Sequence, residues 1–233
     1  MKLETVIKDV RRGAARAAIV RLDLAGAAFP FAAGQAVMAG LAGQPERKPY
    51  SIACSPAQAR AAGCLELLVK TGTAGGAGRH LGHLEAGAAV ELEGPLGRFT
   101  LVGAPDASPL LLVAGGTGIA PLRSMMWAAL ESATPRAIAL LYSARTPAEF
   151  AYLDELRQLS ATGRIRLHLT ATREAGPEWT QGRGRISRTL LAGFVDPSST
   201  VSLVCGPDAL VAAVPAMLRD LGVAGDLIRR EEY

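Results

Sequence analysis

A glycine-rich turn between an apolar run and a helix-like stretch is the first segment of this sequence with the residue types to bind a ligand. The apolar run Leu110–Gly115 leads into Gly116–Gly118, and helical spacing follows from Ala120 to Ser132. Glycines let a backbone approach a ligand closely, and a helix start offers N–H groups and a positive dipole end to a phosphate. Pro121 suits the first turn of a helix, where no N–H is needed. The segment predicts a phosphate-binding loop, although alone it fits an ordinary strand-to-helix turn equally well.

Two segments of the first half also carry residues suited to binding. In Arg47–Ser51 (RKPYS) two cations could hold a phosphate, Tyr50 could stack on a flat ring, and Ser51 could hydrogen-bond a ring nitrogen. The alternative is a basic loop before an edge strand. The glycine-rich stretch Leu68–Leu81 is a possible second phosphate site, with a flexible hairpin loop as its alternative. Neither segment identifies a ligand by itself.

The elements that must position these segments change character near residue 103. Residues 2–101 contain short strand-like runs separated by turn residues, which predicts an antiparallel barrel or sandwich. The expected strands are Glu4–Val10, Arg16–Leu24, Ala36–Leu41, Tyr50–Ser55, Cys64–Lys70, Ala89–Pro95 and Arg98–Val102, with one helix-like interruption at Ala77–Leu84. Gly103–Pro109 then reads as a linker. We therefore expect two domains, 1–103 and 104–233.

In the second half, apolar strands alternate with segments of helical spacing. The expected strands are Leu110–Gly115, Ala137–Ala144, Arg164–Thr172 and Val201–Gly206, and the expected helices are Ala120–Ser132, Ala148–Ala161 and Asp208–Gly222. Pro215 lies inside the last helix and is expected to kink it. This alternation predicts βαβ units and a parallel sheet.

Composition and charge exclude several classes of protein. The chain has 233 residues, 49% of them hydrophobic, with no apolar run of 18 and no signal-peptide block at the N-terminus. A cytoplasmic protein without membrane insertion is therefore expected. Three isolated cysteines and three histidines offer no disulfide framework, cluster or metal site. A net charge of +4 is too small for a nucleic-acid-binding protein.

The order of the motifs along nearly the whole chain resembles the ferredoxin–NADP reductase superfamily. KPYSIACS and GGAGRHL are similar to its two flavin motifs, and GGTGIAP is similar to its nicotinamide-nucleotide loop. LLYSAR, TATRE, GRGRI, VCGPDALV and the ending REEY follow in the family's order. The resemblance implies an antiparallel Greek-key flavin barrel, a Rossmann-like parallel-sheet nucleotide domain, and FAD and NADP(H) as cofactors.

The resemblance assigns the flavin to the barrel motifs and the C-terminal ring. Tyr50 would stack on one face, Ser51 would lie near N5, and Tyr233 would cover the other face and move aside for the nicotinamide. Two departures from the family pattern concern Lys48, which replaces an arginine and loses its forked geometry, and Gly78, which replaces a hydroxyl residue. The expected flavin-binding residues are Arg47, Lys48, Pro49, Tyr50, Ser51, Val69, Lys70, Gly75, Gly76, Gly78 and Tyr233.

The resemblance also assigns the dinucleotide and the reacting groups. Arg145, Arg173 and Arg185 match arginines that bind the 2′-phosphate in relatives that use NADPH, which favours NADPH over NADH. Glu174 is a complication because it could pair with Arg173. The expected nucleotide-binding residues are Gly116, Thr117, Gly118, Pro121, Ser143, Arg145, Thr172, Arg173, Arg185, Cys205, Gly206 and Pro207, and the expected catalytic residues are Ser51, Cys205, Glu231 and Tyr233.

No cysteine set supports an internal cluster, so electrons must leave to another molecule. A small ferredoxin or flavodoxin is the first expectation, and the excess of 12 basic over 8 acidic residues in 1–103 would steer an acidic carrier. The chain is expected to be a monomer or a weak dimer. Alternatives are an NAD(P)H–flavin reductase that releases reduced flavin, the reductase component of an oxygenase, and a nucleotide-binding regulatory subunit without activity.

Overall fold

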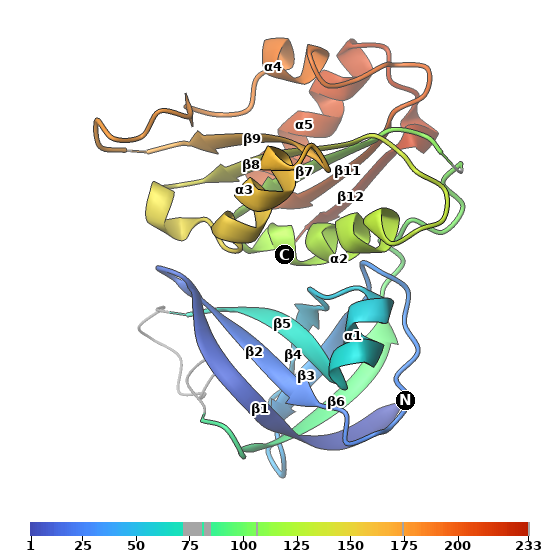
Figure 1. The fold of residues 1–233 in the computed structure, drawn as a ribbon, viewed down its shortest axis with the longest axis vertical. Helices are drawn as coiled ribbons and strands as arrows, with labels where there is room; N and C mark the ends of the chain where they lie inside the picture. Colours follow the sequence, from blue (N-terminus) through green and yellow to red (C-terminus); the bar gives the residue numbers. More distant parts are fainter. Residues whose placement is uncertain (72–80, 82–84, 106, 174, 233) are drawn as a thin grey trace.

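The first half of the chain forms an antiparallel, barrel-like sheet. The structure, a computed structural model, describes residues 1–71, 81, 85–105, 107–173 and 175–232. The sheet order is β4-β3-β6-β1-β2-β5, and a bridge between Ile52 and Leu67 joins the chain just after β4 to β5. This bridge brings the two edges of the sheet together (Figure 1). The strands are β1 (Lys2–Ala14), β2 (Ala17–Asp23), β3 (Ala36–Leu41), β4 (Lys48–Ser51), β5 (Cys64–Lys70) and β6 (Ala89–Leu96).

The second half forms a parallel sheet with helices on both faces. Its order is β10-β9-β8-β7-β11-β12, and every neighbouring pair is parallel. Figure 1 shows α2 and α3 on one face and α4 and α5 on the other. The strands are β7 (Leu110–Gly115), β8 (Ile138–Ala144), β9 (Arg166–Ala171), β10 (Gly182–Arg183), β11 (Val201–Gly206) and β12 (Ile228–Glu232), and the helices are α2 (Ile119–Leu130), α3 (Leu153–Ala161), α4 (Arg188–Ala192) and α5 (Asp208–Asp220).

The burial pattern explains this layering. All six residues of β7 and all six of β11 are buried, as expected for central strands covered on both faces. Leu112 and Leu203 pack in the cluster on the α2 side, whereas Val113 and Val204 pack in the cluster under α5. The predicted fold class, an antiparallel flavin-type barrel followed by a Rossmann-like domain, is confirmed.

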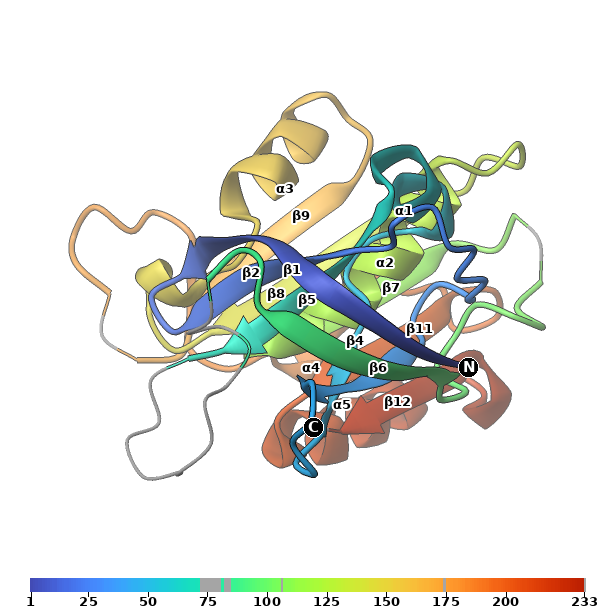
Figure 2. The same ribbon diagram turned by 90° about the horizontal axis from the view of Figure 1, so that it is seen from below.

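Helix α2 lies between the parallel sheet and the barrel (Figures 1 and 2). Its buried residues share one hydrophobic cluster with Ala53, Leu68 and Phe99 of the barrel half. This helix directly follows the glycine turn, a short 3-10 helix η2 at Gly116–Gly118. The contact surface between the two halves is therefore built around the segment expected to bind a nucleotide.

Several expected elements in the barrel half differ from the structure. The strand expected over Tyr50–Ser55 ends at Ser51, and helix α1 (Pro56–Ala62) begins after Ser55, whose side chain forms a capping box with Gln58. The strand expected at Arg98–Val102 is wrong. Gly97 has φ +91° and ends the pairing after β6, and the chain then bends so that Phe99 is buried. Of the helix-like segment 77–84, only Leu81 belongs to the described residues.

Some elements of the second half also differ from expectation, among them α3 and β12. The helix expected from Ala148 begins only at Leu153, because Tyr152 has φ +58° and a 3-10 turn, η3 (Pro147–Glu149), precedes it. Strand β12 was not expected, since its residues Ile228–Glu232 are mostly charged. It pairs with β11 at the edge of the sheet, where alternate side chains reach solvent. Pro215 lies within α5 without ending the helix.

In the part of the chain that the structure describes, no helix has both the length and the apolar character that a membrane span requires.

Candidate active site

The glycine turn lies at the point where the parallel sheet changes direction. Strand β7 pairs with β8 on one side and with β11 on the other. The chain leaves β7 for β8 and, later, leaves β11 for β12, so the connections diverge at this pair. A crevice at the carboxyl ends of such a pair is where open α/β sheets bind ligands. The residues at these ends are Gly115–Gly118 and Cys205–Pro207.

Two glycines of the turn are required by packing between the strand ends. A Cβ on Gly118 would lie 2.6 Å from the carbonyl carbon of Cys205, and one on Gly115 would lie 2.8 Å from Cδ of Pro207. Gly116 instead has φ +55°, a conformation that favours glycine. Its carbonyl accepts a 2.9 Å hydrogen bond from the Tyr142 hydroxyl, which fixes the turn from below. Gly116 and Thr117 remain partly exposed beyond the carboxyl end of β7.

Cys205 and Glu231 are paired across the neighbouring strands β11 and β12. The Cys205 side chain is buried, and burial together with the nearby charge of Glu231 raises the pKa of its thiol. Burial also raises the pKa of the Glu231 carboxyl from 4.5 to about 7. A carboxyl group with this pKa can hold and release a proton near neutrality. The pair thus combines a neutral thiol with a carboxyl poised for proton exchange.

A series of contacts connects this pair to the barrel strand β4. Gly97 faces Glu231, because a Cβ built on Gly97 would lie 3.8 Å from Oε1 of Glu231. The carbonyl of Gly97 accepts a 3.2 Å hydrogen bond from Nε2 of Gln35. The carbonyl of Gln35 in turn accepts a 2.9 Å bond from the N–H of Ile52, directly after Ser51. The flavin-like motif and the glycine turn therefore lie at the two ends of one connected region.

The residues of the RKPYS segment have different environments. Tyr50 and Ser51 are partly buried, Tyr50 packs against the barrel core, and burial raises the pKa of its phenol. Pro49 is exposed. Lys48 forms a 3.2 Å ion pair with Glu46. Arg47 binds Glu91 and, at 3.5 Å, Glu93 on β6, so its charge is already compensated within the barrel.

The second flavin-like motif lies largely outside the described residues. Val69, the last residue but one of β5, has its side chain buried in the barrel core, and Lys70 is exposed at the end of that strand. Only the backbone of Val69 is therefore available to a ligand. Gly75, Gly76, Gly78 and Tyr233 lie outside the described residues.

Three predicted phosphate-binding arginines lie at one edge of the sheet. Arg145 and Arg173 follow β8 and β9, and the N–H of Arg173 donates a 2.8 Å hydrogen bond to the carbonyl of Arg145. Arg185 follows β10 and is exposed like the other two. Thr172 lies beside them and donates to the carbonyl of Ala144. Within the described residues none of the three arginines forms an ion pair.

Ser143 and Pro121 complete the set of predicted nucleotide residues, and both are buried next to the turn. Ser143 pairs with Gly115 across β8 and β7, and Pro121 lies in the first turn of α2. Gly206 has φ +158° and approaches Gly115, and Pro207 is exposed before α5. The structure thus brings these residues together at the carboxyl ends of β7, β8 and β11.

Sequence reasoning missed Gln35 and Gly97, which join the two halves of the site. Gln35 precedes an expected strand and belongs to no motif, whereas Gly97 lies in the stretch LEAGAAVELEGPLGRFTL, which resembles the family's barrel strands but assigned no role to Gly97. A glycine next to a proline-containing strand end was the one local signal for Gly97. Their meeting depends on tertiary structure.

Comparison with known proteins agrees with this geometry. Residues 4–101 match the oxidoreductase FAD-binding domain family, and residues 112–215 match the oxidoreductase NAD-binding domain family. FAD and a nicotinamide dinucleotide are therefore the cofactors of the two matched families, as predicted.

Three of the similar proteins are named reductases. A ferredoxin–NADP reductase B of Sorangium cellulosum is 37% identical over 221 residues, which cover 89% of this chain and 87% of the relative. The structure of the Amycolatopsis cytochrome P450 reductase GcoB has a TM-score of 0.85 and 28% identity, over 100% of this chain and 69% of that chain. A ferredoxin NADP+ reductase from Neisseria gonorrhoeae with bound FAD and NADP shares the fold, with a TM-score of 0.82 and 22% identity over 99% and 98% of the two chains. This chain therefore belongs to the ferredoxin–NADP reductase family.

Proposed function

We propose that this oxidoreductase passes a hydride between NADPH and bound FAD, and then exchanges single electrons with a small carrier, a ferredoxin or a flavodoxin. The observation that carries the proposal is the connected region from Ser51 through Gln35, Gly97 and Glu231 to Cys205 at the glycine turn. This region joins β4, which carries the flavin-like motif, to the glycine turn expected to bind the dinucleotide. Residues 1–103 would form the flavin domain and residues 104–233 the nucleotide domain.

The residues of the barrel fit a flavin in part. Bound FAD supplies the chemistry that side chains lack, which is to accept a hydride and release electrons one at a time. Tyr50 offers a partly buried ring for stacking, and Ser51 offers a hydroxyl at the end of β4. Lys48 is paired with Glu46 and Arg47 with Glu91, so each cation would have to leave a carboxylate to bind the pyrophosphate. Val69 and Lys70 offer backbone groups at the end of β5.

The carboxyl ends of β7 and β11 carry residue types that suit a dinucleotide. Gly116 and Thr117 present the partly exposed part of the turn, and Cys205 and Gly206 are buried at the end of the neighbouring strand β11. Cys205 would orient the nicotinamide, and Glu231 would hold a proton at its carboxyl oxygen near the flavin edge. Tyr233 would cover the flavin face and leave it when the nicotinamide enters.

NADPH rather than NADH is supported by charge. The 2′-phosphate of NADPH needs cations, and Arg145, Arg173 and Arg185 gather at the edge formed by β8, β9 and β10. The Sorangium relative, named a ferredoxin–NADP reductase, supports the same choice of nucleotide and the choice of carrier.

A second candidate function is favoured by one comparison. The Amycolatopsis structure is named a cytochrome P450 reductase, so this chain could be the reductase component of an oxygenase, with another redox protein as its acceptor. A reductase that releases free reduced flavin is the remaining enzymatic alternative, suggested by Lys48 and Gly78. The cytoplasmic location and the monomeric or weakly dimeric state stay predictions.

An absorbance experiment tests the proposal. The purified protein should retain FAD through gel filtration and lose its visible flavin bands under anaerobic addition of NADPH, faster than with NADH. A colourless protein that reduces added flavin would support the flavin-reductase alternative. A FAD-loaded protein that neither nucleotide bleaches would contradict the proposed function and favour a regulatory subunit.

A further inference from the structure

We propose that Arg123 is a positioning residue, which holds the flavin strand and the dinucleotide turn in the relative placement that hydride transfer requires. The inference rests on the proposed function. Arg123 lies five residues after Gly118, in the second turn of α2, so one turn of helix joins it to the glycine turn. Its partner Ala53 lies two residues after Ser51. One side chain thus joins the two segments that would carry the two cofactors.

Arg123 uses all parts of its guanidinium group. Nη1 donates to the carbonyl of Ala53 at 2.7 Å and to Oε1 of Glu66 at 3.2 Å. Nε and Nη2 form a forked pair with the two carboxylate oxygens of Glu155, at 2.8 and 2.6 Å. The group also lies 4.3 Å from the ring centroid of Tyr152. Because Arg123 is only 6% exposed, these contacts fix both its position and its orientation.

A second bond from the next residue strengthens the connection. The Ser124 hydroxyl donates a 2.6 Å hydrogen bond to the carbonyl of Cys54. Two successive residues of α2 therefore bind two successive carbonyls directly after the flavin strand. This pattern fixes the register between helix and strand, since a shift along either would break both bonds.

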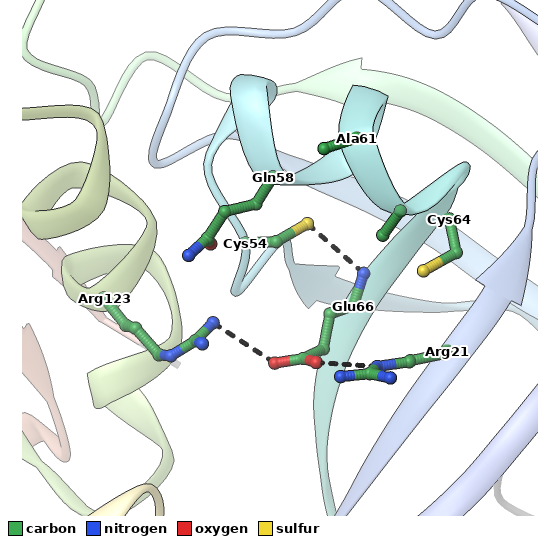
Figure 3. Close-up of a pocket in the computed structure, with 8 residues that line it drawn as sticks. Arg21, Cys54, Gln58, Ala61, Cys64, Glu66 and Arg123 are labelled. Carbon is green, nitrogen blue, oxygen red and sulfur yellow. Dashed lines mark hydrogen bonds and ion pairs between the residues drawn. The ribbon is translucent and has the colours of Figure 1, made fainter. Parts of the chain in front are cut away.

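Glu66 of β5 is shared between the two halves. Its side chain is 6% exposed and lies between Arg123 on one side and Arg21 of β2 on the other, as Figure 3 shows. Arg21 donates to Oε2 of Glu66 at 3.0 Å, and Arg11 at 3.3 Å. Glu66 therefore keeps two partners in the barrel when Arg123 is removed.

Stability alone does not account for this buried network. Replacing a buried ion pair by apolar residues of similar volume is often neutral or stabilising, whereas polar groups can specify one arrangement. Hydride transfer depends on such an arrangement, because a displacement of about 1 Å can lower a rate about 100-fold. A cavity of about 370 Å³ beside Glu66, lined also by Cys54, Gln58 and Cys64, gives water access to the carboxylate in a variant without Arg123.

The test compares Arg123→Met with Arg21→Met. Both variants remove a guanidinium from the same carboxylate, but only Arg123 crosses between the halves. In the FAD-loaded protein, Arg123→Met should lower the rate constant of flavin reduction by NADPH at least tenfold. The Kd for NADP⁺, which binds without reducing the flavin, should change less than about threefold. Arg21→Met should stay within about twofold of wild type in both quantities.

A second measurement needs no cofactor. Spin labels at Arg60→Cys on α1 and Arg157→Cys on α3 report the distance between the two halves, because both positions are exposed and the native cysteines are buried. Arg123→Met should broaden or shift the distance distribution, and Arg21→Met should not.

Two results would overturn the proposal. One is a rate constant in Arg123→Met no lower than in Arg21→Met, whatever the distances show. The other is a slower rate with an unchanged distance distribution, which would place the effect elsewhere than in domain placement. If the wild-type protein itself is not reduced by NADPH, the proposed function fails, while the distance measurement still reports on the role of Arg123.

Discussion

At the residue scale, the environment of an arginine decides what it can bind. Arg183 donates to the carbonyls of Ala175, Gly176 and Trp179, so it closes the loop before β10. Arg185, two residues later, is exposed at the sheet edge. The sequence GRGR does not distinguish these two roles, because they depend on which carbonyls the fold brings near each side chain.

The exposed arginines predict how the enzyme chooses its nucleotide. Removing Arg173 and Arg185 together (Arg173→Ala with Arg185→Ala) should raise the KM for NADPH at least roughly tenfold, because each lost charged hydrogen bond costs about 1.5–3 kcal/mol. The KM for NADH should change little, since NADH lacks the 2′-phosphate. Arg157→Ala on α3, also exposed, is the matched control. Equal increases for both nucleotides would contradict the assignment.

Glu231 predicts a pH dependence of stability. Burial raises the pKa of this carboxyl from 4.5 to about 7, so the folded protein binds the proton more tightly than the unfolded chain does. The stabilisation is fully present below pH 4.5 and is lost as the pH rises through about 7. Glu231→Gln should remove this contribution. The difference in thermal midpoint, variant minus wild type, should therefore increase as the pH is raised from 5 to 8. A constant difference in thermal midpoint between the two proteins across that range would contradict the raised pKa of Glu231.

At the element scale, the sequence predicted the strand–turn–helix unit of β7, η2 and α2. It did not predict the structural reason why a glycine is needed at each position of the turn. The pattern GGTG indicates a tight turn, and the structure shows that two of its glycines serve contact with the end of β11. Likewise, Ser55, Pro56, Gln58 and Gly63 are the capping signals of α1, and they were present in the sequence. Helix α1 was not predicted because it has seven residues and buries only Ala59, so no helical period of apolar residues marks it.

The contact between η2 and β11 predicts the effect of Gly118→Ala. The added Cβ would lie 2.6 Å from the carbonyl carbon of Cys205 and 2.8 Å from the nitrogen of Gly206, and these backbone atoms cannot rotate away. We expect a loss of about 1–3 kcal/mol in the free energy of unfolding, measured with urea. Gly193→Ala, at φ −77° with its nearest neighbour at 3.5 Å, is the control and should change stability little. An unchanged Gly118→Ala protein would mean that the two strand ends can separate.

At the scale of the whole molecule, the two sheets in the two halves of the chain could be predicted from the sequence. The contact between the two halves could not. Alternating short strands and βαβ spacing predicted both sheets and their order in the chain. Glu66 in CLELLVK and Arg123 in APLRS look like solvent-facing charges, yet both are buried where the barrel meets α2. Their burial becomes favourable only because each supplies the other's partner across the interface, which no local pattern reveals.

The charge of the whole molecule predicts how it meets its carrier. Residues 1–103 carry 12 basic and 8 acidic residues, whereas residues 104–233 carry 13 of each. Arg98 is exposed beside Gly97, which faces Glu231 at the proposed flavin edge. Attraction between exposed charges weakens as the Debye length falls from about 10 Å at 0.1 M salt to about 3 Å at 1 M. An acidic carrier should therefore be reduced more slowly as salt rises.

We expect the second-order rate constant for reduction of an acidic ferredoxin to fall about tenfold between 0.05 and 0.5 M salt. The rate with an uncharged quinone should stay nearly constant, because its encounter has no electrostatic term. Arg98→Glu should lower the ferredoxin rate at low salt and flatten its salt dependence, whereas Arg219→Glu, exposed on α5, should do neither. If both charge reversals act alike, net charge rather than a local surface governs the encounter. If neither acts and salt has no effect, the carrier is not recognised through the basic half, and an uncharged acceptor becomes the better candidate.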